Sequence, residues 1–185
     1  MTLQHEIIEV DVGHLLEAAQ KRAESLGALS GSMRGIQASQ VGCLGELVGM
    51  EYLEGVNVSF AEIFSTTHDL SMKVHGQDKT MELKAKERTA RPRETFDCTT
   101  PDYNKDHQRP DYYLFISLLS TGGKDIHRFT KGYILGSIGR RKFDRIAKFW
   151  QPSDTDKSNG WKPTIACWNV TVTDLTPPKR KGDLS

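Results

Sequence analysis

The chain is poor in cysteine, in long apolar runs and in net charge, and the first two shortages each exclude a class of protein. Its three cysteines, Cys43, Cys98 and Cys167, are widely spaced and form no CxxC pair, so we expect neither a disulfide framework nor a structural zinc site. The longest uncharged apolar run, residues 112–119, is far too short to span a bilayer. The N-terminus lacks the basic start and apolar block of a secretion signal. We therefore expect a cytoplasmic protein with no membrane partner.

The net charge of +1 says little about nucleic acid, because local charge patches set that affinity. What is present fits a soluble globular protein, since 37% of the residues are apolar and 26% are charged. A chain of 185 residues is most simply one domain with a substantial core. We expect this domain to span residues 1–176 and to be followed by a flexible basic tail, residues 177–185.

Apolar spacing and turn residues predict both helices and strands. The chain is expected to begin with helices over 15–26 and 38–53 and a strand over 58–64. Two strands around 68–75 and 80–86 follow and are joined by a polar turn at 76–79. The second half is expected to contain a short helix from Thr100-Pro101 that ends before Pro110, strands over 111–119 and 128–136, a helix marked by Phe143, Ile146, Ala147 and Trp150, and a strand over 165–175. A loop at 29–35 separates the first two helices. The sum is a mixed central sheet flanked by helices, an α/β or α+β architecture.

Two carboxylates and a lysine are expected on adjacent strands of the predicted hairpin. Side chains alternate across a strand, so Glu82 and Lys84 share one face while Leu83 points into the core. Pairing across the turn brings Asp69 to the strand end that faces Glu82. Two neighbouring carboxylates resist ionisation unless a cation lies between them, and Mg²⁺ prefers such oxygen ligands. The alternative is a hairpin whose outer face is merely solvated.

The second predicted helix adds another carboxylate in an unusual setting. Glu46 shares its helical face with three glycines, Gly42, Gly45 and Gly49. Each glycine costs a helix about 1 kcal/mol relative to alanine, so this stripe predicts that another backbone or a ligand approaches closely. The alternative is close packing of helix on sheet with Glu46 incidental, and such packing would also bring Glu46 towards the hairpin.

The order of these elements resembles the PD-(D/E)XK nuclease superfamily. The resemblance covers residues 38–119 and consists of a helix with Gly45-Glu46, three strands carrying Asp69 and then Glu82-Leu83-Lys84, a helix and a further strand. His68 stands where the family name expects proline, a position that varies among members. The resemblance implies a restriction-endonuclease-like fold.

The same resemblance implies roles for individual residues. Asp69 and Glu82 would ligate Mg²⁺, for which Mn²⁺ can substitute, and the Leu83 carbonyl and Glu46 would be further ligands. Lys84 would position or activate the hydrolytic water. Gln108 resembles a glutamine that some branches place in the active site, although an exposed helix end explains its position equally well.

Two basic clusters could hold a nucleic-acid backbone. The first follows the catalytic strand and contains Lys86, Arg88, Arg91 and Arg93. The second lies on the helix near residue 143, where Arg141, Arg145 and Lys148 share a face. A charged helix face that is simply solvated is the alternative for the second cluster. Backbone contacts of this kind would give little sequence preference.

These features predict a Mg²⁺-dependent nuclease that hydrolyses phosphodiester bonds in DNA. Within that class, a structure-selective endonuclease or an exonuclease of phage-like replication, recombination or repair fits the small size. Symmetric cleavage would require a homodimer, and nothing in the sequence separates DNA from RNA as the substrate. The alternative is a non-catalytic nucleic-acid-binding or assembly protein on the same fold.

Overall fold

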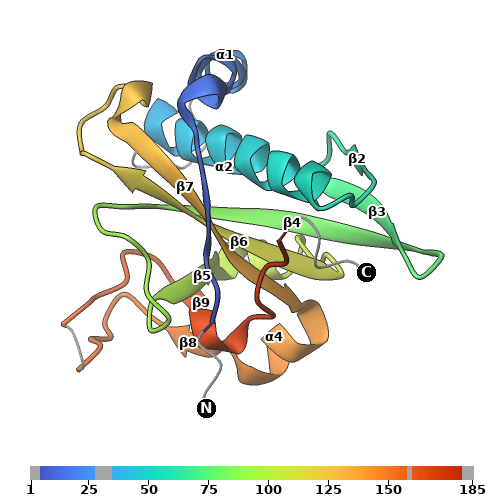
Figure 1. Cartoon of the computed structure of the whole chain (residues 1–185). Coiled ribbons are helices and arrows are strands. Elements are labelled where there is room, and N and C mark those ends of the chain that lie inside the picture. Colours follow the sequence, from blue (N-terminus) through green and yellow to red (C-terminus); the bar gives the residue numbers. More distant parts are fainter. Residues whose placement is uncertain (1–4, 28–34, 158–159, 181–185) are drawn as a thin grey trace.

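A six-stranded mixed sheet forms the centre of the protein (Figure 1), whose computed structural model describes residues 5–27, 35–157 and 160–180. Across the sheet, the strands are β1 (Ile8–Val10), β7 (Phe129–Gly139), β6 (Tyr112–Ser120), β4 (Gln77–Arg88), β3 (Leu70–Val74) and β2 (Phe60–Glu62). Only the β4–β6 pairing is parallel among these neighbours. The predicted mixed sheet flanked by helices is confirmed.

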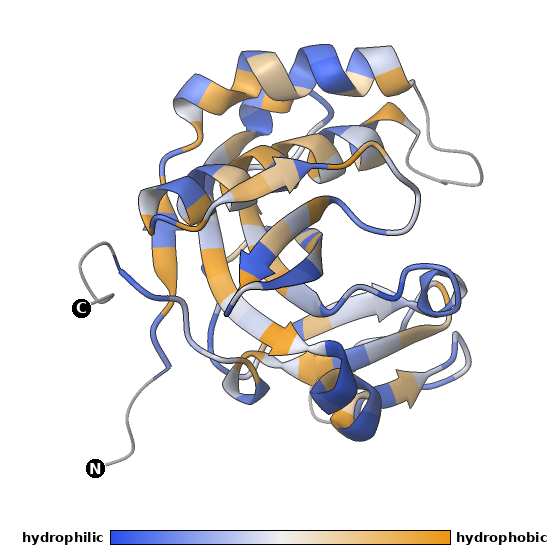
Figure 2. Ribbon diagram, turned by 90° about the vertical axis from the view of Figure 1, so that its right-hand side faces the viewer, coloured by the Kyte–Doolittle hydropathy of each residue, from blue (hydrophilic) through white to orange (hydrophobic). Residues whose placement is uncertain are grey.

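Two helices cover one face of this sheet, and their order follows from their composition. The helix α2 (Ile36–Gly55) lies between the sheet and α1 (Leu16–Leu26), and it is the more hydrophobic of the two (Figures 1 and 2). Its predicted apolar residues Val41, Leu44 and Val48 are buried in the main core. Both helices were predicted, whereas the loop predicted over 29–35 lies almost wholly outside the described residues.

A second, smaller sheet and a helix cover the opposite face, and the sequence predicted the helix and the last strand of this layer but not its other two strands or their pairing. The small sheet has the order β5 (Asp97–Pro101), β9 (Cys167–Thr171) and β8 (Lys148–Trp150). The short helices in and around this layer are α3 (Asp102–Lys105), α4 (Arg140–Ile146) and the 3₁₀ turn η3 (Val172–Asp174). Two further 3₁₀ turns lie on the side of α1 and α2: η1 (Gly13–Leu15), which precedes α1, and η2 (Ile126–Arg128), which contacts it. Phe143 of α4 is fully buried, with its ring centroid 5.0 Å from that of Tyr113.

Three boundaries in this layer differ from the prediction. The helix marked by Phe143 ends at Ile146, because Ala147 takes extended dihedral angles, and Trp150 therefore lies on strand β8. Thr100 belongs to β5 and does not cap α3. The strand predicted over 165–175 consists of β9 and then η3.

The hairpin that carries the candidate site turns two residues earlier than predicted. Val74 pairs with Gln77, so the turn consists of His75 and Gly76 and the strand β4 begins at Gln77. Both turn residues have positive φ, 50° and 76°, as a two-residue hairpin turn of type I′ requires. The hairpin itself was predicted correctly.

The described part of the C-terminal tail is not a free end. Pro178 is buried, and the Lys179 amide donates to the Tyr52 hydroxyl of α2 at 2.9 Å. Arg180 forms an ion pair with Glu6. Residues 177–180 therefore lie against the domain, residues 181–185 lie outside the described chain, and the flexibility of the tail stays a prediction.

No helix in residues 5–27, 35–157 and 160–180 is both long and apolar enough to cross a membrane. The three cysteines are buried free thiols, as expected from their spacing.

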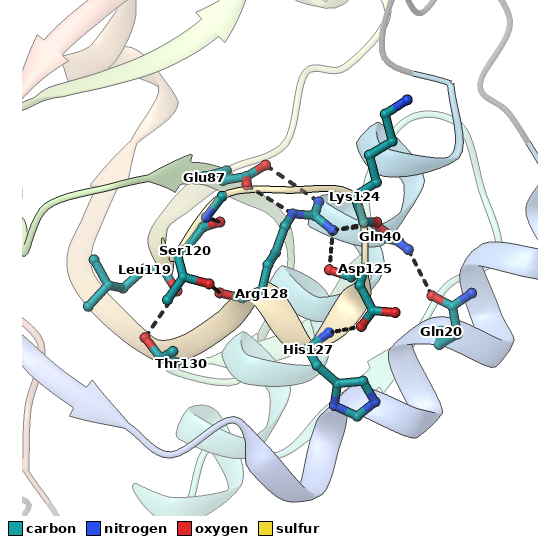
Figure 3. Close-up of polar contacts among 12 residues, drawn as sticks. Gln20, Gln40, Glu87, Leu119, Ser120, Lys124, Asp125, His127, Arg128 and Thr130 are labelled. Carbon is teal, nitrogen blue, oxygen red and sulfur yellow. Dashed lines mark hydrogen bonds and ion pairs between the residues drawn. The ribbon is translucent and has the colours of Figure 1, made fainter.

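A buried arginine joins both helices to the end of β4 (Figure 3). Arg128 donates to both carboxylate oxygens of Glu87, at 2.9 and 3.5 Å, and to the Gln40 side chain at 2.6 Å. Gln40 of α2 in turn donates to Gln20 of α1 at 2.8 Å. Because Arg128 has 3% exposure, this network fixes α1 and α2 relative to the strand that carries the candidate site.

The glycine stripe on α2 gives a pair of stability predictions of opposite sign. A Cβ at Gly45 would lie closer than 3.0 Å to the Ala85 Cβ of β4, whereas a Cβ at Gly42 would meet no atom within 4 Å. The predicted close approach therefore exists at Gly45 but not at Gly42. We expect Gly45→Ala to destabilise the protein by about 1–3 kcal/mol through overpacking.

The matched control, Gly42→Ala, should stabilise the protein by about 0.4–1 kcal/mol by reducing the entropy of the unfolded chain. Urea denaturation of both variants measures the two free energies of unfolding. Equal effects of the two substitutions would show that α2 does not approach β4 closely at Gly45.

Candidate active site

Asp69 is held beside Glu82 by the way in which the β3–β4 ladder ends. The ladder stops at the pair Leu70 and Met81, and Asp69 is the residue before it. The Asp69 amide donates to the Met81 carbonyl at 3.1 Å, and its Oδ2 accepts the Leu83 amide at 2.7 Å. The Asp69 carboxylate thus accepts the Leu83 amide where a carbonyl of β3 would accept it if the ladder continued. The backbone of β4 therefore fixes the position of this carboxylate.

Lys84 is fixed by two side-chain oxygens. Its Nζ donates to Glu82 Oε1 at 2.7 Å and to Gln108 Oε1 at 2.6 Å. Gln108 lies after α3, not on it as predicted. Its backbone N–H donates to the backbone carbonyl of Asn104 at 2.8 Å. The Gln108 Nε2 is also 3.5 Å from the Thr66 carbonyl in the loop before Asp69. Gln108 therefore joins Lys84 to that loop.

The Glu82 carboxylate lies in a poorly solvated position with one oxygen unsatisfied. Glu82 is 5% exposed, and its Oε2 has no hydrogen-bond partner in the described part of the chain. Burial raises the pKa of Glu82 to about 7, and repulsion from Asp69 adds to the shift against the opposing effect of Lys84. Burial also raises the pKa of Asp69, although the bond from the Leu83 amide opposes this. Two such carboxylates ionise together readily only when a cation is close.

Glu46 reaches the same region but is engaged by an arginine that the sequence did not reveal. Arg22 of α1 donates to Glu46 Oε2 at 3.2 Å and also to Glu62 of β2. Burial raises the pKa of Glu46 to about 7, repulsion from Asp69 raises it further, and Arg22 lowers it. No sequence signal joins Arg22 and Glu62 to the site, because the contacts arise from the packing of α1 over α2.

A cavity of about 650 Å³ opens along this group of residues. Its charged lining residues are Lys21, Arg22, Glu46, Glu62 and Asp69. Leu83 and Phe64 also line it, and Phe64 is 92% exposed. The cavity therefore gives solvent and ligands access to Glu46, Glu62 and Asp69, whereas Glu82 and Lys84 do not line it.

The carboxylates fit a magnesium ion that keeps part of its water shell. Among the described residues, no three histidine, cysteine, aspartate or glutamate side chains form a metal-binding group by themselves. Mg²⁺ is commonly bound by one or two carboxylates together with water and substrate phosphates. Asp69 and Glu82, through its unsatisfied oxygen, supply two such carboxylates. In an extended strand the N–H and C=O of one residue point to the same edge, so the Leu83 carbonyl lies on the Asp69 side of β4.

The basic residues predicted to bind nucleic acid are not all brought to the site. Lys86 lies two residues beyond Lys84 on the same face of β4, and its Nζ donates to the Thr99 hydroxyl at 3.2 Å. Arg88 is instead used internally, since its guanidinium contacts the Asp97 carbonyl and covers the Phe96 ring. Arg88 thus attaches the small sheet to β4, and its predicted DNA contact has no support.

The remaining basic residues lie on exposed surfaces at different distances from the site. Arg91 is over the Tyr133 ring of β7, on the other side of β4 from Asp69. Arg93 belongs to the same exposed loop. Arg141 and Arg145 are exposed on α4. The helix α4 contacts the segment after α3 through an ion pair between Arg109 and Asp144 at 3.4 Å. Because Arg109 directly follows Gln108, this ion pair attaches α4 next to Gln108.

The raised carboxyl pKa values predict an unusual dependence of stability on pH. Glu82 and Glu46 bind protons more tightly in the folded state, with pKa values of about 7 against an ordinary value of 4.5. Their contribution to stability is therefore greatest below the ordinary pKa and is lost as the pH rises towards 7. Without divalent ions, we expect the melting temperature to be lower at pH 8 than at pH 5.

Calorimetry at a series of pH values, with and without Mg²⁺, measures this dependence. Mg²⁺ should raise the melting temperature more at pH 8 than at pH 5, because it favours the ionised carboxylates. Glu82→Gln should flatten the pH profile. A melting temperature that depends on pH equally in wild type and Glu82→Gln would contradict the assigned pKa shift of Glu82.

Comparison of the chain with protein-family models, with curated proteins and with solved structures finds no match. Functional inference therefore depends on the geometry described above.

Proposed function

We propose that the protein is a Mg²⁺-dependent DNA nuclease of the PD-(D/E)XK type. The observation that carries the proposal is the buried Glu82 oxygen without a partner, next to Asp69 and to a lysine held in place by two oxygens. The element order α2, β2, β3, β4, β5, α3, β6 supports it, because the family core has a helix, three strands, a helix and a strand in that order and only β5 is additional. A solvated hairpin face would not bury these groups.

Asp69 and Glu82 would hold the cation, with the Leu83 carbonyl at the same edge. When bound, Mg²⁺ supplies charge stabilisation to a phosphate and lowers the pKa of a bound water. Lys84 has three N–H donors, and Glu82 and Gln108 accept from it. One donor therefore stays available for the attacking water or a phosphate oxygen. Gln108 acts as a positioning residue, since it orients Lys84 and joins it to the Thr66 loop.

Glu46 would contact the cation directly or through water once Arg22 releases it. In the described structure Arg22 neutralises Glu46 and Glu62. A substrate phosphate competes well for a guanidinium, because arginine binds phosphate in a bidentate manner. This exchange would leave the Glu46 carboxylate free as DNA enters the cavity.

Lys86 and the exposed cations of α4 are the residues best placed to follow a DNA backbone away from the site. Contacts of this kind are independent of base sequence, which suits selection by DNA structure or by a strand end. Endonucleolytic cleavage of two strands would require a homodimer. A structure-selective endonuclease or an exonuclease needs only such backbone contacts.

Cleavage of labelled DNA by the purified chain tests the proposal. Linear, nicked, branched and single-stranded DNA, together with matched RNA, are incubated with Mg²⁺, with Mn²⁺ and with EDTA. We expect metal-dependent products from at least one DNA substrate and none in EDTA. Intact substrates in every metal-containing reaction would contradict the nuclease. Salt-sensitive binding that ignores divalent ions would instead favour a non-catalytic DNA-binding protein.

A further inference from the structure

The small sheet carries an aromatic cluster that the proposed chemistry does not use. Phe149 of β8 and Trp168 of β9 are directly paired across the two strands, and their ring centroids are 4.9 Å apart. Lys105 of α3 places its Nζ 3.4 Å from the centroid of the Trp168 ring. We call these three residues the stacking cluster. Figure 1 shows that the small sheet lies on the opposite side of the large sheet from α1 and α2.

Part of the cluster is open to solvent and part is fixed. Phe149 is 37% exposed, which is high for a phenylalanine in a strand. Trp168 is half-buried, and its Nε1 donates to Asp102 Oδ1 at 2.6 Å. The indole is thus held rigidly under the exposed phenyl ring. A rigid, exposed ring beside a lysine is the combination that proteins use to stack nucleic-acid bases and hold their phosphates.

The charge around the cluster favours an anionic partner. The segment from residue 140 to residue 150 is strongly basic, and its charged residues are Arg140, Arg141, Lys142, Arg145 and Lys148 against the single acid Asp144. Arg145 is exposed, whereas Lys148 lies over the Trp150 ring and so is on the strand face opposite Phe149. The acid of α3, Asp102, is already the acceptor for Trp168, and Asp106 follows that helix. Because the basic residues of α4 and Lys105 outnumber these acids, the local charge favours a polyanion.

The cluster is connected to the candidate active site through a few residues. Trp168 bonds to Asp102 at the start of α3, Lys105 ends that helix, and Gln108 follows it and accepts from Lys84 at 2.6 Å. The segment from Asp102 to Gln108 therefore runs from the cluster to the catalytic lysine. This continuity links the surface to the proposed chemistry.

We infer that the stacking cluster binds an unpaired base of a single-stranded DNA segment next to the cleavage position. This inference rests on the proposed function and deepens it, because it assigns substrates with single-stranded segments, such as flaps or frayed ends. Bases in a duplex are stacked on each other and do not offer a free face. The cluster therefore discriminates by strand state and not by sequence.

Binding measured in EDTA tests the inference without any requirement for cleavage. All three tryptophans of the chain, Trp150, Trp161 and Trp168, lie in or beside the small sheet, so intrinsic fluorescence reports mainly on this surface. A single-stranded oligothymidine should quench the fluorescence, and a matched duplex should not. Phe149→Ala should raise the Kd for the oligothymidine about 5- to 100-fold and leave the Kd for the duplex unchanged.

Two further variants make the result specific. Phe149→Tyr keeps an aromatic ring and should retain binding, whereas Ile36→Ala removes a similarly exposed apolar side chain at the start of α2 and should change nothing. Equal single-strand binding by wild type and Phe149→Ala, or equal loss in Phe149→Ala and Phe149→Tyr, would overturn the stacking role. Selective single-strand binding without cleavage in Mg²⁺ would keep the surface and refute the nuclease. Cleavage without single-strand preference would refute only the surface.

Discussion

Lys84→Ala should lower the rate of Mg²⁺-dependent DNA cleavage by at least about 100-fold, as expected for loss of one fixed donor to the developing charge. The lysine is held by Glu82 and Gln108 at 2.7 and 2.6 Å, so its remaining donor has a defined direction. Removal of the side chain deletes that donor and leaves the carboxylates in place. Single-turnover cleavage of the favoured substrate measures the effect on the chemical step.

Lys79→Ala is the matched control for this substitution. Lys79 lies on the same strand and is also partly buried, but its ion pair at 3.7 Å is with Asp111, away from Asp69 and Glu82. We expect this variant to cleave at the wild-type rate. Thermal melting of both variants shows whether each is folded. A folded Lys84→Ala protein with the activity of Lys79→Ala would mean that Lys84 is only a structural partner of Glu82.

Arg128→Ala should be the most destabilising single substitution considered for this chain. It removes the buried cation that donates to Glu87, whose side chain is 12% exposed, and so breaks a buried ion pair. Breaking a buried pair in this way costs about 3–5 kcal/mol. For a protein of this size, that corresponds to a fall in melting temperature of roughly 6–20 °C. Differential scanning calorimetry measures both quantities.

An exposed ion pair provides the control for Arg128. Lys131 and Glu9 are 2.9 Å apart, with side chains 42% and 41% exposed, and exposed pairs contribute about 0–1 kcal/mol. Lys131→Ala should therefore barely change the melting temperature. The double variant Arg128→Met with Glu87→Leu should regain much of the lost stability, because neither charge is then left alone. Similar melting temperatures for Arg128→Ala and Lys131→Ala would contradict the network in Figure 3.

The residues of the candidate site that depend on local rules could be predicted from the sequence. Alternation along one strand fixes Glu82 and Lys84 on one face and Leu83 in the core, and the structure has this arrangement. The hairpin places Asp69 next to Glu82 because the turn is two residues earlier than predicted. The predicted turn at 76–79 would have placed Asp69 opposite Lys86, so the position of Asp69 depends on the observed register and on its own carboxylate, which closes the ladder.

The predictions that failed involve contacts between distant segments. Phe143, Ile146, Ala147 and Trp150 have helical spacing, yet Trp150 pairs in β8 with Cys167 of β9, a partner that no local pattern indicates. The strand β5 is short, polar and ends in a proline, so its sequence resembles a loop. The segments β5 and β8, whose sequences give little indication of a strand, form the small sheet only when they pair with β9.

The same limit explains the missed side chains of the site. Arg22 meets Glu46 and Glu62 across 24 and 40 residues of sequence. The residues around Arg22 in α1 give no sign of this contact, because an arginine on the solvent-exposed face of a helix would be surrounded by the same kind of sequence. The stacking cluster was missed for a related reason, because Phe149 and Trp168 become neighbours only through the pairing of β8 with β9.

The central claim is that Asp69 and Glu82 together hold a divalent cation, and a Mn²⁺ titration of the unliganded protein followed by electron paramagnetic resonance tests it most directly. We predict a bound ion in the wild type and its loss in Asp69→Asn, which keeps an oxygen to accept the Leu83 amide. Asp78→Asn, an exposed carboxylate on the same hairpin, should bind as the wild type does. Equal Mn²⁺ binding by all three proteins, or binding by none, would contradict the account.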